Sequence, residues 1–454
     1  MYAVTNPIDE TLVQKFSTCT ESEIDGAVSA AHQEYLIWSR RDLDMRTAII
    51  NKAAALFAER SDEFVAIMSR EMGKRVSDAR GEMEIVCKIF SYYADNARQL
   101  LADEEFPITG GTGTIRKTGV GPILGIMPWN YPVYQVARFA APNLVLGNTV
   151  LLKHAPICPE TALAIEQLMH DAGIPKGAYV NIFASHEQVA TIISDPRVHG
   201  VSLTGSERAG AAVAAEAGKH LKKVVLELGG SDPMVILDSD DLPALAHRAA
   251  EARLDNMGQA CNSPKRMIVL QDIYPDFVTE LVKDFTGYAP GDPMVEGATL
   301  APLSTKVAAQ RVHAQVARAR EQGASIECGG NLIGEVGAYF EATVITGVTP
   351  AMDIHHEEVF GPVAIVYSAS HEDQALELAN DTPFGLGSSV FATDPKRAMA
   401  FGRQVEAGMV YVNNVGGSQA DLPFGGVKRS GIGRELGYLG IEEFMNKQVI
   451  RVLD

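Results

Sequence analysis

The spacing of hydrophobic and polar positions changes once along the chain. Between residues 22 and 105, apolar residues recur three and four positions apart behind acidic or serine starts, which predicts amphipathic helices. From Pro122 onward, short apolar runs such as NTVLLKH alternate with helical segments such as PETALAIEQLMHDAG. This alternation predicts right-handed βαβ units around a parallel sheet. A second alternation starts near Asp232, so we expect two α/β lobes.

Two further segments have the pattern of strands that lie outside both lobes. TIRKTGV, just before Pro122, alternates like a strand of a hairpin, and the C-terminal EEFMNKQVIRVLD also ends in a strand-like run. We expect these segments to pair with each other. Arms of this kind often bridge subunits.

One apolar stretch is long enough to imitate a membrane span. Between Gly121 and Leu152 the only charged residue is Arg138. Four prolines interrupt this stretch, and each proline disfavours a continuous helix. We therefore expect buried strands and helix starts in a soluble core and no membrane span.

The composition narrows the classes of function. Apolar residues make up 46% of the 454 residues and charged residues 21%, as in ordinary globular proteins. The net charge of −18 disfavours binding to nucleic acid or to acidic membrane surfaces. The five cysteines have no metal-ligand spacing, and the sequence MYAVTNPIDE has no targeting pattern. We expect a reduced cytoplasmic protein without a metal site.

Cys261, in the window NMGQACNSPKR, is a candidate nucleophile. Uncharged amide side chains surround it, and the nearest charged residues are Asp255 and Lys265. A thiolate that attacks a carbonyl group needs amide donors close to the oxyanion that forms. The simpler explanation is an ordinary buried cysteine, because free cysteines are often buried.

Glu227, in VVLELGGSDP, is a candidate general base. It ends an apolar strand directly before two glycines, and strand ends open onto clefts in α/β proteins. Apolar neighbours raise the pKa of a carboxyl group, which suits a base that activates water near neutral pH. The simpler explanation is a cap for the following turn.

Two features suggest a phosphate-binding cleft. Thr204, Gly205 and Ser206 join a predicted strand to a helix, where backbone N–H groups and the helix dipole favour an anion. Lys153 ends another predicted strand and could reach a ribose or phosphate. An ordinary packing turn and a solvated lysine are the simpler explanations.

These residues lie in motifs that resemble the aldehyde dehydrogenase superfamily. The matches keep their order and spacing over essentially the whole chain. They are MPWN at 127–130, LTGS at 203–206, LELGG at 226–230, NMGQAC ending at Cys261, EEVFGPV at 357–363, NDTPFGLGSSVF at 380–391 and LPFGGVKRSGIGRE at 422–435.

The resemblance implies an α/β fold with a Rossmann-like cofactor lobe, an α/β catalytic lobe and a small β bridging domain that builds homodimers or homotetramers. It places the cofactor-binding domain at 1–108 and 124–229, the catalytic domain at 230–422, and the bridging elements at 109–123 and 423–454.

The resemblance also implies roles for individual residues. Cys261 is the expected nucleophile, Asn130 and the Cys261 backbone N–H form the oxyanion hole, and Glu227 activates the water that hydrolyses the thioester. A hydride passes to a nicotinamide cofactor. The expected cofactor contacts are Trp129, Lys153, Gly205, Ser206, Glu358 and Phe360.

The segment after Lys153 departs from a common family pattern. Many members that favour NAD carry an acidic residue three positions after this lysine, where it binds both ribose hydroxyls, but this chain has Pro156. No carboxylate there repels a 2′-phosphate, so we expect NADP to be accepted and preferred, with NAD as the second cofactor.

Arg138 suggests the substrate. It follows Asn130 by about two helical turns, and an unpaired buried guanidinium would suit a carboxylate on a small aldehyde. A structural ion pair with a distant carboxylate is the alternative. With Ser418, this arrangement is similar to the succinate-semialdehyde dehydrogenase branch, where an arginine and a serine hold the distal carboxylate.

Three other functions stay open from the sequence. The first is a dehydrogenase of other aliphatic aldehydes without a carboxylate anchor. The second is a non-catalytic binding or structural member of the fold, and the third is a thioester hydrolase without hydride transfer. The presence of Asn130, Glu227 and Cys261 disfavours the second, and the cofactor motifs disfavour the third.

Overall fold

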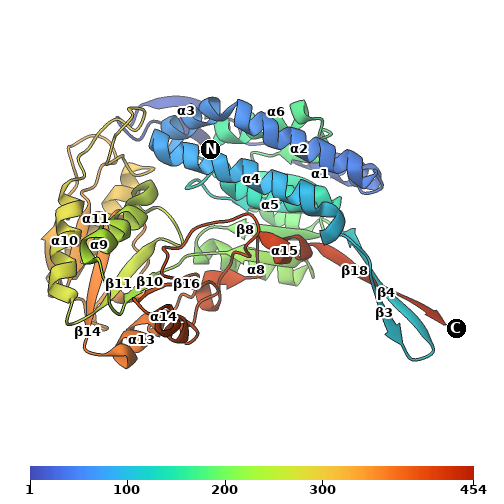
Figure 1. Ribbon diagram of the computed structural model, residues 1–454. Helices are drawn as coiled ribbons and strands as arrows, with labels where there is room; N and C mark the ends of the chain where they lie inside the picture. Colours follow the sequence, from blue (N-terminus) through green and yellow to red (C-terminus); the bar gives the residue numbers. More distant parts are fainter. Residues whose placement is uncertain (454) are drawn as a thin grey trace.

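The computed structural model describes residues 1–453, and a layer of four helices follows its two N-terminal strands. Thr20 and Glu23 form a reciprocal capping box at the start of the first helix, which satisfies two of its unpaired backbone donors. The four helices are α1 (Glu21–Trp38), α2 (Leu43–Glu59), α3 (Ser61–Met72) and α4 (Val76–Leu100). They lie side by side in Figure 1, and the expectation of helices between residues 22 and 105 is confirmed.

The first lobe is built on a six-stranded sheet with the order β17-β9-β8-β5-β6-β7. Its strands are parallel except β17, which pairs antiparallel with β9. The strands are β5 (Pro122–Met127), β6 (Thr149–His154), β7 (Tyr179–Asn181), β8 (Gly200–Thr204), β9 (Lys223–Glu227) and β17 (Gly431–Ile432). The helices are α5 (Tyr134–Leu146), α6 (Pro159–Ala172), α7 (His186–Ser194) and α8 (Glu207–Lys219). Helices α5 and α6 share one core with α2–α4 and with Trp38 at the end of α1, whereas the rest of α1 shares another core with α7 and α8.

The second lobe has its own core and a seven-stranded sheet with the order β12-β13-β14-β11-β10-β15-β16. The strands are β10 (Asp232–Ile236), β11 (Pro264–Leu270), β12 (Ser325–Cys328), β13 (Thr343–Thr346), β14 (Val363–Ala369), β15 (Ser389–Phe391) and β16 (Tyr411–Val412). The helices are α9 (Leu242–Leu254), η1 (Asp255–Gly258), α10 (Tyr274–Thr286), α11 (Lys306–Glu321), α12 (Asp353–His356), α13 (Glu372–Asn380) and α14 (Pro395–Gly402). The expectation of two α/β lobes is confirmed.

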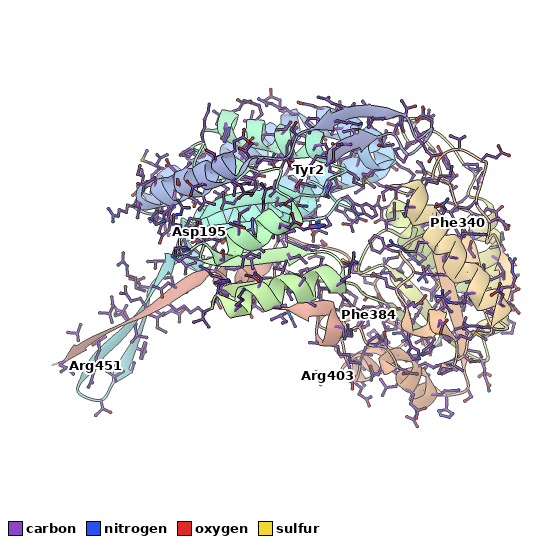
Figure 2. All side chains as sticks on the ribbon, turned by 180° about the vertical axis from the view of Figure 1, so that it is seen from behind. Tyr2, Asp195, Phe340, Phe384, Arg403 and Arg451 are labelled. Carbon is purple, nitrogen blue, oxygen red and sulfur yellow. The ribbon has the colours of Figure 1, made fainter. Side chains whose placement is uncertain are left out.

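A three-stranded arm projects from the first lobe. Its strands are β3 (Glu104–Ile108), β4 (Gly111–Gly119) and β18 (Met445–Leu453), and β18 pairs with β4 along its whole length. The arm reaches away from both lobes, with Arg451 near its tip in Figure 2. The expected pairing between TIRKTGV and the C-terminal segment is therefore confirmed. The remaining elements are β1 (Tyr2–Thr5), β2 (Leu12–Phe16), η2 (Lys428–Ser430) and α15 (Gly437–Glu442).

The apolar stretch around Arg138 folds into β5, α5 and β6 within the first lobe. Pro142 lies inside α5, which corrects the expectation that every proline marks a break or a helix start. Among residues 1–453, no helix is both long and apolar enough to cross a membrane.

Candidate active site

The predicted site residues gather where the two sheets face each other. Asn130, Ser206 and Glu227 lie at or just after the carboxyl ends of strands in the first sheet. Cys261 and Glu358 lie just before β11 and β14 of the second sheet. This arrangement brings segments far apart in the sequence to one junction, as expected for a ligand site in α/β folds.

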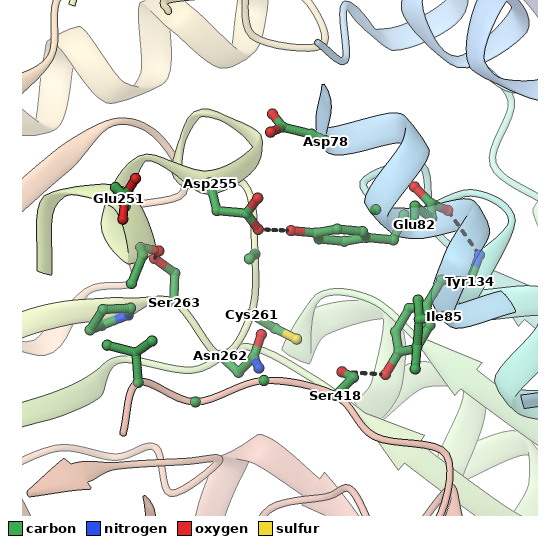
Figure 3. A pocket seen from close by; sticks show the side chains of 18 of the residues that line it. Asp78, Glu82, Ile85, Tyr134, Glu251, Asp255, Cys261, Asn262, Ser263 and Ser418 are labelled. Carbon is green, nitrogen blue, oxygen red and sulfur yellow. Dashed lines mark hydrogen bonds between the residues drawn. The ribbon is translucent and has the colours of Figure 1, made fainter. Parts of the chain in front are cut away.

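Two cavities meet at Cys261. The larger, about 640 Å³, is lined by residues of α4, α5, α9 and the 414–418 loop, and Figure 3 shows Cys261 and Ser418 facing it. The smaller, about 270 Å³, is lined by Asn130, the Gly205–Ser206 turn and Glu358. A group bound in either cavity can therefore approach the same sulfur atom. We call the larger one the substrate cavity and the smaller one the cofactor cleft.

The loop that carries Cys261 starts with unusual backbone angles. Asn256 and Met257 have φ values of 47° and 54°, in the left-handed region that asparagine tolerates but methionine rarely adopts. The buried Arg253 guanidinium donates to the carbonyl oxygens of Gly258 and Gly361 at 3.2 and 2.6 Å. These hydrogen bonds stabilise the loop in its strained conformation.

Asn130 lies next to this loop with its amide directed towards it. Its Nδ2 donates to the carbonyl oxygen of Gln259 at 3.0 Å, while Asn256 Nδ2 donates to the Asn130 carbonyl at 2.8 Å. A primary amide has two N–H bonds, so one remains for a ligand. The Cys261 backbone N–H has no acceptor among residues 1–453. The two free donors are those that an oxyanion hole requires.

Burial dominates the ionisation of Cys261. It raises the pKa of the thiol to about 12, while Arg138 and Lys265 act in the opposite direction and Glu227 and Glu358 reinforce the rise. The thiol is therefore predominantly protonated at neutral pH. A bound group that adds positive charge near the sulfur would favour the thiolate.

Glu227 ends β9 as predicted and is fully buried. Its carboxylate oxygens have no hydrogen-bond partner among residues 1–453, and it lines neither cavity. A side chain at Gly425 would come within 2.7 Å of Glu227 Oε1, so the glycine makes room for the carboxyl group. Burial raises the pKa of Glu227 well above its ordinary value, and Arg138 partly offsets this rise.

Arg138 lines the substrate cavity, but it is not unpaired. Its Nε atom forms an ion pair with Glu435, from the segment that follows β17, and its Nη2 donates to Thr204 Oγ1 at 3.2 Å. The expectation of a guanidinium without a carboxylate partner is therefore wrong. A buried arginine is costly without a counter-charge, and Glu435 supplies one from a distant part of the chain.

Tyr134 was not predicted, yet it connects the two expected substrate contacts. Its hydroxyl donates to Ser418 Oγ at 2.7 Å and accepts a longer contact of 3.4 Å from Arg138 Nη1. Tyr134 precedes Arg138 by four positions on α5, so the two share a helix face. That spacing was the available sequence signal. The three side chains form one polar wall of the substrate cavity.

The cofactor cleft has the features that a dinucleotide requires. Gly205 and Ser206 line it at the N-terminus of α8, where Ser206 accepts from the Ala209 N–H. Trp129 and Phe360 pack edge to face at 5.8 Å. The remaining lining residues include Glu358, the only carboxylate among them. A pyrophosphate at the helix end and a ribose at the carboxylate both fit this arrangement.

Lys153 and Pro156 line neither cavity. Lys153 is buried at the end of β6, and its ammonium group has no ion pair or hydrogen bond among the first 453 residues but lies 5.5 Å from the centre of the Tyr2 ring. Burial lowers the pKa of its ammonium group to about 8. Pro156 is exposed, and its carbonyl oxygen accepts from the Ala3 N–H at 3.0 Å. No carboxylate occupies the position of Pro156.

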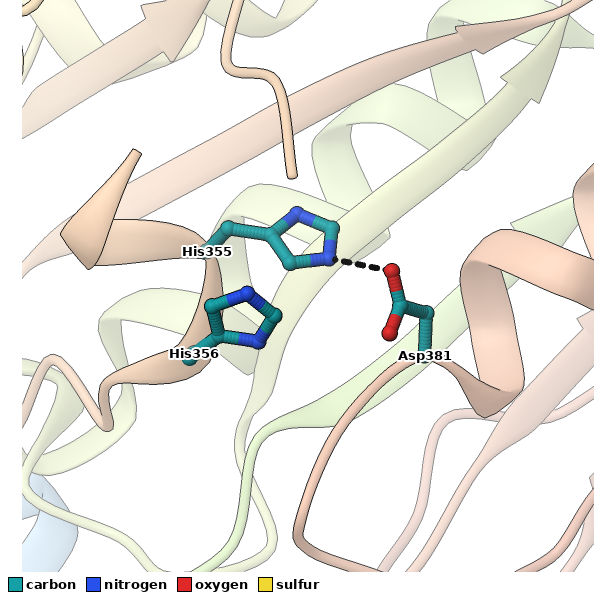
Figure 4. A group of neighbouring side chains, drawn as sticks. All are labelled: His355, His356 and Asp381. Carbon is teal, nitrogen blue, oxygen red and sulfur yellow. Dashed lines mark hydrogen bonds and ion pairs between the residues drawn. The ribbon is translucent and has the colours of Figure 1, made fainter. Parts of the chain in front are cut away.

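One group of metal-ligating side chains lies apart from both cavities. His355, His356 and Asp381 place one ligand atom each within 4.8 Å of one another (Figure 4). The two ring nitrogens of His355 contact Tyr367 Oη and Asp381 Oδ2, both at 3.1 Å, and His356 Nε2 contacts the Pro350 carbonyl at 3.0 Å. Hydrogen bonds thus account for this cluster. The absence of a metal site stays a prediction.

Comparisons with known proteins agree with this geometry. Residues 1–450 match the family described as the aldehyde dehydrogenase family. The chain is 47% identical over 450 residues to an NADP(+) succinate-semialdehyde dehydrogenase of Deinococcus radiodurans, covering 99% of this chain and 94% of that protein. It is 41% identical over 451 residues to the corresponding enzyme of Mycobacterium tuberculosis, covering 99% of each.

A solved structure is also similar over its full length. The succinic semialdehyde dehydrogenase of Streptococcus pyogenes, determined with NADP+, superimposes with a TM-score of 0.98 at 40% identity and covers 100% of each chain. This similarity and the full-length family match confirm the expected fold and resemblance. The chain is an oxidoreductase that belongs to the aldehyde dehydrogenase family.

Proposed function

We propose that this enzyme oxidises succinate semialdehyde, or a similar short semialdehyde, to the carboxylic acid, and that it uses NADP+ in preference to NAD+. The observation that carries this proposal is one cavity that joins Cys261 to the polar wall of Arg138, Tyr134 and Ser418. The relatives named for succinate semialdehyde and NADP(+) support the same substrate and cofactor.

The chemistry starts at Cys261. The thiol first loses its proton to solvent, and the thiolate sulfur then bonds to the aldehyde carbon as the C=O double bond opens. The oxygen that becomes negative accepts hydrogen bonds from the Asn130 side chain and the Cys261 backbone N–H. A bound nicotinamide supplies a hydride acceptor. The resulting thioester on Cys261 is cleaved by a water molecule that Glu227 deprotonates. Since Glu227 lines neither cavity, its side chain must turn towards Cys261 for this last step.

Distinct residues would hold each part of the cofactor. We assign the pyrophosphate to Gly205 and Ser206, and the nicotinamide ribose to Glu358, with Trp129 and Phe360 forming the apolar walls of the cleft. Lys153 would contact the adenosine side. The absence of a carboxylate at Pro156 leaves room for a 2′-phosphate, and the ammonium of Lys153 attracts it.

Cofactor preference is expected to depend on pH through Lys153. Its pKa of about 8 means that the ammonium loses its proton as pH rises through this value, so affinity for the 2′-phosphate falls above it. Between pH 7 and pH 9.5 the Kd of NADP+ should rise roughly threefold to tenfold relative to that of NAD+. Fluorescence titration measures both constants. In Lys153→Gln the ratio should be flat, and a flat ratio in the wild type would remove Lys153 from the 2′-phosphate site.

The substrate assignment is tested through Arg138. Removing it alone would leave Glu435 as an uncompensated buried charge and lower stability for a reason unrelated to substrate. We therefore use the double variant Arg138→Leu/Glu435→Gln. Its kcat/KM for succinate semialdehyde should fall about tenfold to a hundredfold, the value of a lost charge-assisted hydrogen bond. Its kcat/KM for butanal should fall far less, because butanal has no carboxylate and loses only the lowering of the Cys261 pKa that Arg138 provides.

The control is Glu435→Gln alone, which keeps the guanidinium and should retain the preference for succinate semialdehyde. Equal losses for charged and neutral aldehydes in the double variant would show that Arg138 does not bind the substrate carboxylate. The enzyme would then be a dehydrogenase of general aliphatic aldehydes.

We further propose that the enzyme is a cytoplasmic homo-oligomer in which the three-stranded arm binds a second copy. Strand β18 carries the exposed apolar side chains Val449, Val452 and Leu453, far from either lobe's core. The domain ranges expected from the resemblance remain part of this proposal, with the C-terminal segment also contributing β17 to the first sheet. The free cysteines suit a reducing compartment.

A further inference from the structure

Lys265 is a buried lysine beside the nucleophile that has no role in the mechanism above. It lies on β11, and only 1% of its surface is exposed. Its Nζ donates to the carbonyl oxygens of Ala260 and Cys261 at 2.8 and 2.7 Å. The same atom lies 3.3 Å from Glu358 Oε1. All three N–H bonds of the ammonium group therefore have an acceptor.

The contact with Ala260 fixes the direction of a donor that the reaction needs. The Ala260 carbonyl and the Cys261 N–H belong to one peptide group, and in a planar trans peptide these two bonds point in opposite directions. Holding the carbonyl oxygen on one side therefore directs the N–H to the other side. The positive charge of the ammonium next to this oxygen also polarises the peptide, which strengthens the N–H as a donor.

The contact with Glu358 reaches the cofactor cleft. Glu358 Oε1 also accepts from the Gly230 N–H at 3.1 Å, and Gly230 ends the LELGG segment that contains Glu227. Lys265 and Gly230 thus hold one oxygen of the carboxylate, which fixes the orientation of the other. A single ammonium group is bonded both to the nucleophile loop and to the carboxylate assigned to the nicotinamide ribose.

We propose that Lys265 is a positioning residue. It orients the Cys261 backbone N–H towards the oxyanion and fixes the position of the Cys261 loop relative to the Glu358 carboxylate. The proposal rests on the role of Cys261 proposed above. It assigns Lys265 no contact with the aldehyde. The consequence is that losing the ammonium group slows the first half-reaction equally for charged and neutral aldehydes.

The electrostatic surroundings point in the same direction. Lys265 and Arg138 are the two cations that lower the pKa of Cys261 against the effects of burial, Glu227 and Glu358. Removing Lys265 should therefore shift the alkylation of Cys261 by iodoacetamide to higher pH. This readout needs neither cofactor nor aldehyde.

The neighbouring residue offers a matched control. Arg266 is also a buried cation on β11, and its guanidinium donates to the carbonyl oxygens of Ser231, Leu378 and Ala379 at 2.9, 2.6 and 2.9 Å. It therefore binds backbone as Lys265 does, but it contacts neither the Cys261 loop nor Glu358. A general loss of backbone contacts would affect both variants alike.

The experiment compares Lys265→Met with Arg266→Met. We expect Lys265→Met to slow the burst of reduced cofactor about tenfold to a hundredfold with succinate semialdehyde and with butanal, as for a misaligned oxyanion donor. Its KM values should change little, and its alkylation profile should move to higher pH. Arg266→Met should lower the melting temperature while its folded fraction keeps a burst rate within about threefold of the wild type.

The proposal is overturned if the burst rate of Lys265→Met stays within about threefold of the wild type. It is also overturned if the burst rates of both variants fall in proportion to the decrease in their melting temperatures. If Lys265→Met does not fold, Lys265→Arg is measured instead, because it keeps the charge but not the geometry. A slowed burst with an unshifted pH dependence of Cys261 alkylation supports the proposal. An unchanged burst overturns it. Activity of Cys261→Ala would instead contradict the proposed role of Cys261.

Discussion

Cys261→Ala is expected to abolish aldehyde oxidation, with turnover below about one per cent of the wild type, because only the sulfur can form the covalent adduct. Both cavities meet at this residue, and no second cysteine lines either of them. The small side chain of alanine leaves the loop contacts of Arg253 and Lys265 in place. NADP+ binding and the melting temperature should therefore stay close to those of the wild type.

The control for this variant is Cys328→Ala. Cys328 is a half-buried free cysteine on β12, remote from both cavities, so its removal should leave the rate unchanged. Formation of reduced cofactor is followed by absorbance, and cofactor binding by fluorescence. Turnover of Cys261→Ala above one per cent of the wild type would exclude it as the nucleophile. Loss of cofactor binding would show that the substitution damaged the cleft.

The local pattern predicted most of the architecture. The change from helical spacing to alternating strands and helices places both lobes, because each strand or helix needs its own periodic apolar face. The pairing of β18 with β4 could also be inferred, since both strands alternate and neither fits the parallel sheets. The order of strands within each sheet was not inferred, because periodicity does not specify which strands become neighbours.

Site residues that belong to a sequence motif could be predicted. Interactions between residues far apart in the sequence could not. Arg138 was recognised as an unusual buried charge, but Glu435 lies almost three hundred positions away and no local pattern connects them. In the sequence, Lys265 is distinguished only as the boundary of an uncharged window. Its contacts become visible only when the backbone carbonyls of Ala260 and Cys261 are placed.

The ion pair between Arg138 and Glu435 also affects the pKa of the proposed general base, Glu227. Two buried carboxyl groups, Glu227 and Glu435, lie within the field of the Arg138 guanidinium, and burial raises the pKa of both. A guanidinium bonded to Glu435 is less available to lower the pKa of Glu227. This arrangement keeps Glu227 basic enough to accept a proton from water, which a strongly stabilised carboxylate would not do.

Glu227→Gln is therefore expected to separate the two halves of the reaction. The amide has the shape of the carboxyl group but accepts no proton, so the burst of reduced cofactor should persist while the steady-state rate falls about a hundredfold or more. In the wild type the raised pKa means that Glu227 is protonated at low pH and gains its charge as pH rises, so steady-state turnover should increase with pH. That pH dependence should disappear in Glu227→Gln.

Stopped-flow absorbance measures the burst and the steady state in one experiment. Glu227→Asp serves as the control, since it keeps an ionisable group and should retain part of the pH dependence with a lower rate. If Glu227→Gln shows no burst, the carboxyl group acts in the attack by Cys261, and the raised pKa of that thiol gives the reason. A burst followed by an unchanged steady state would instead assign the activation of water to another group near Cys261.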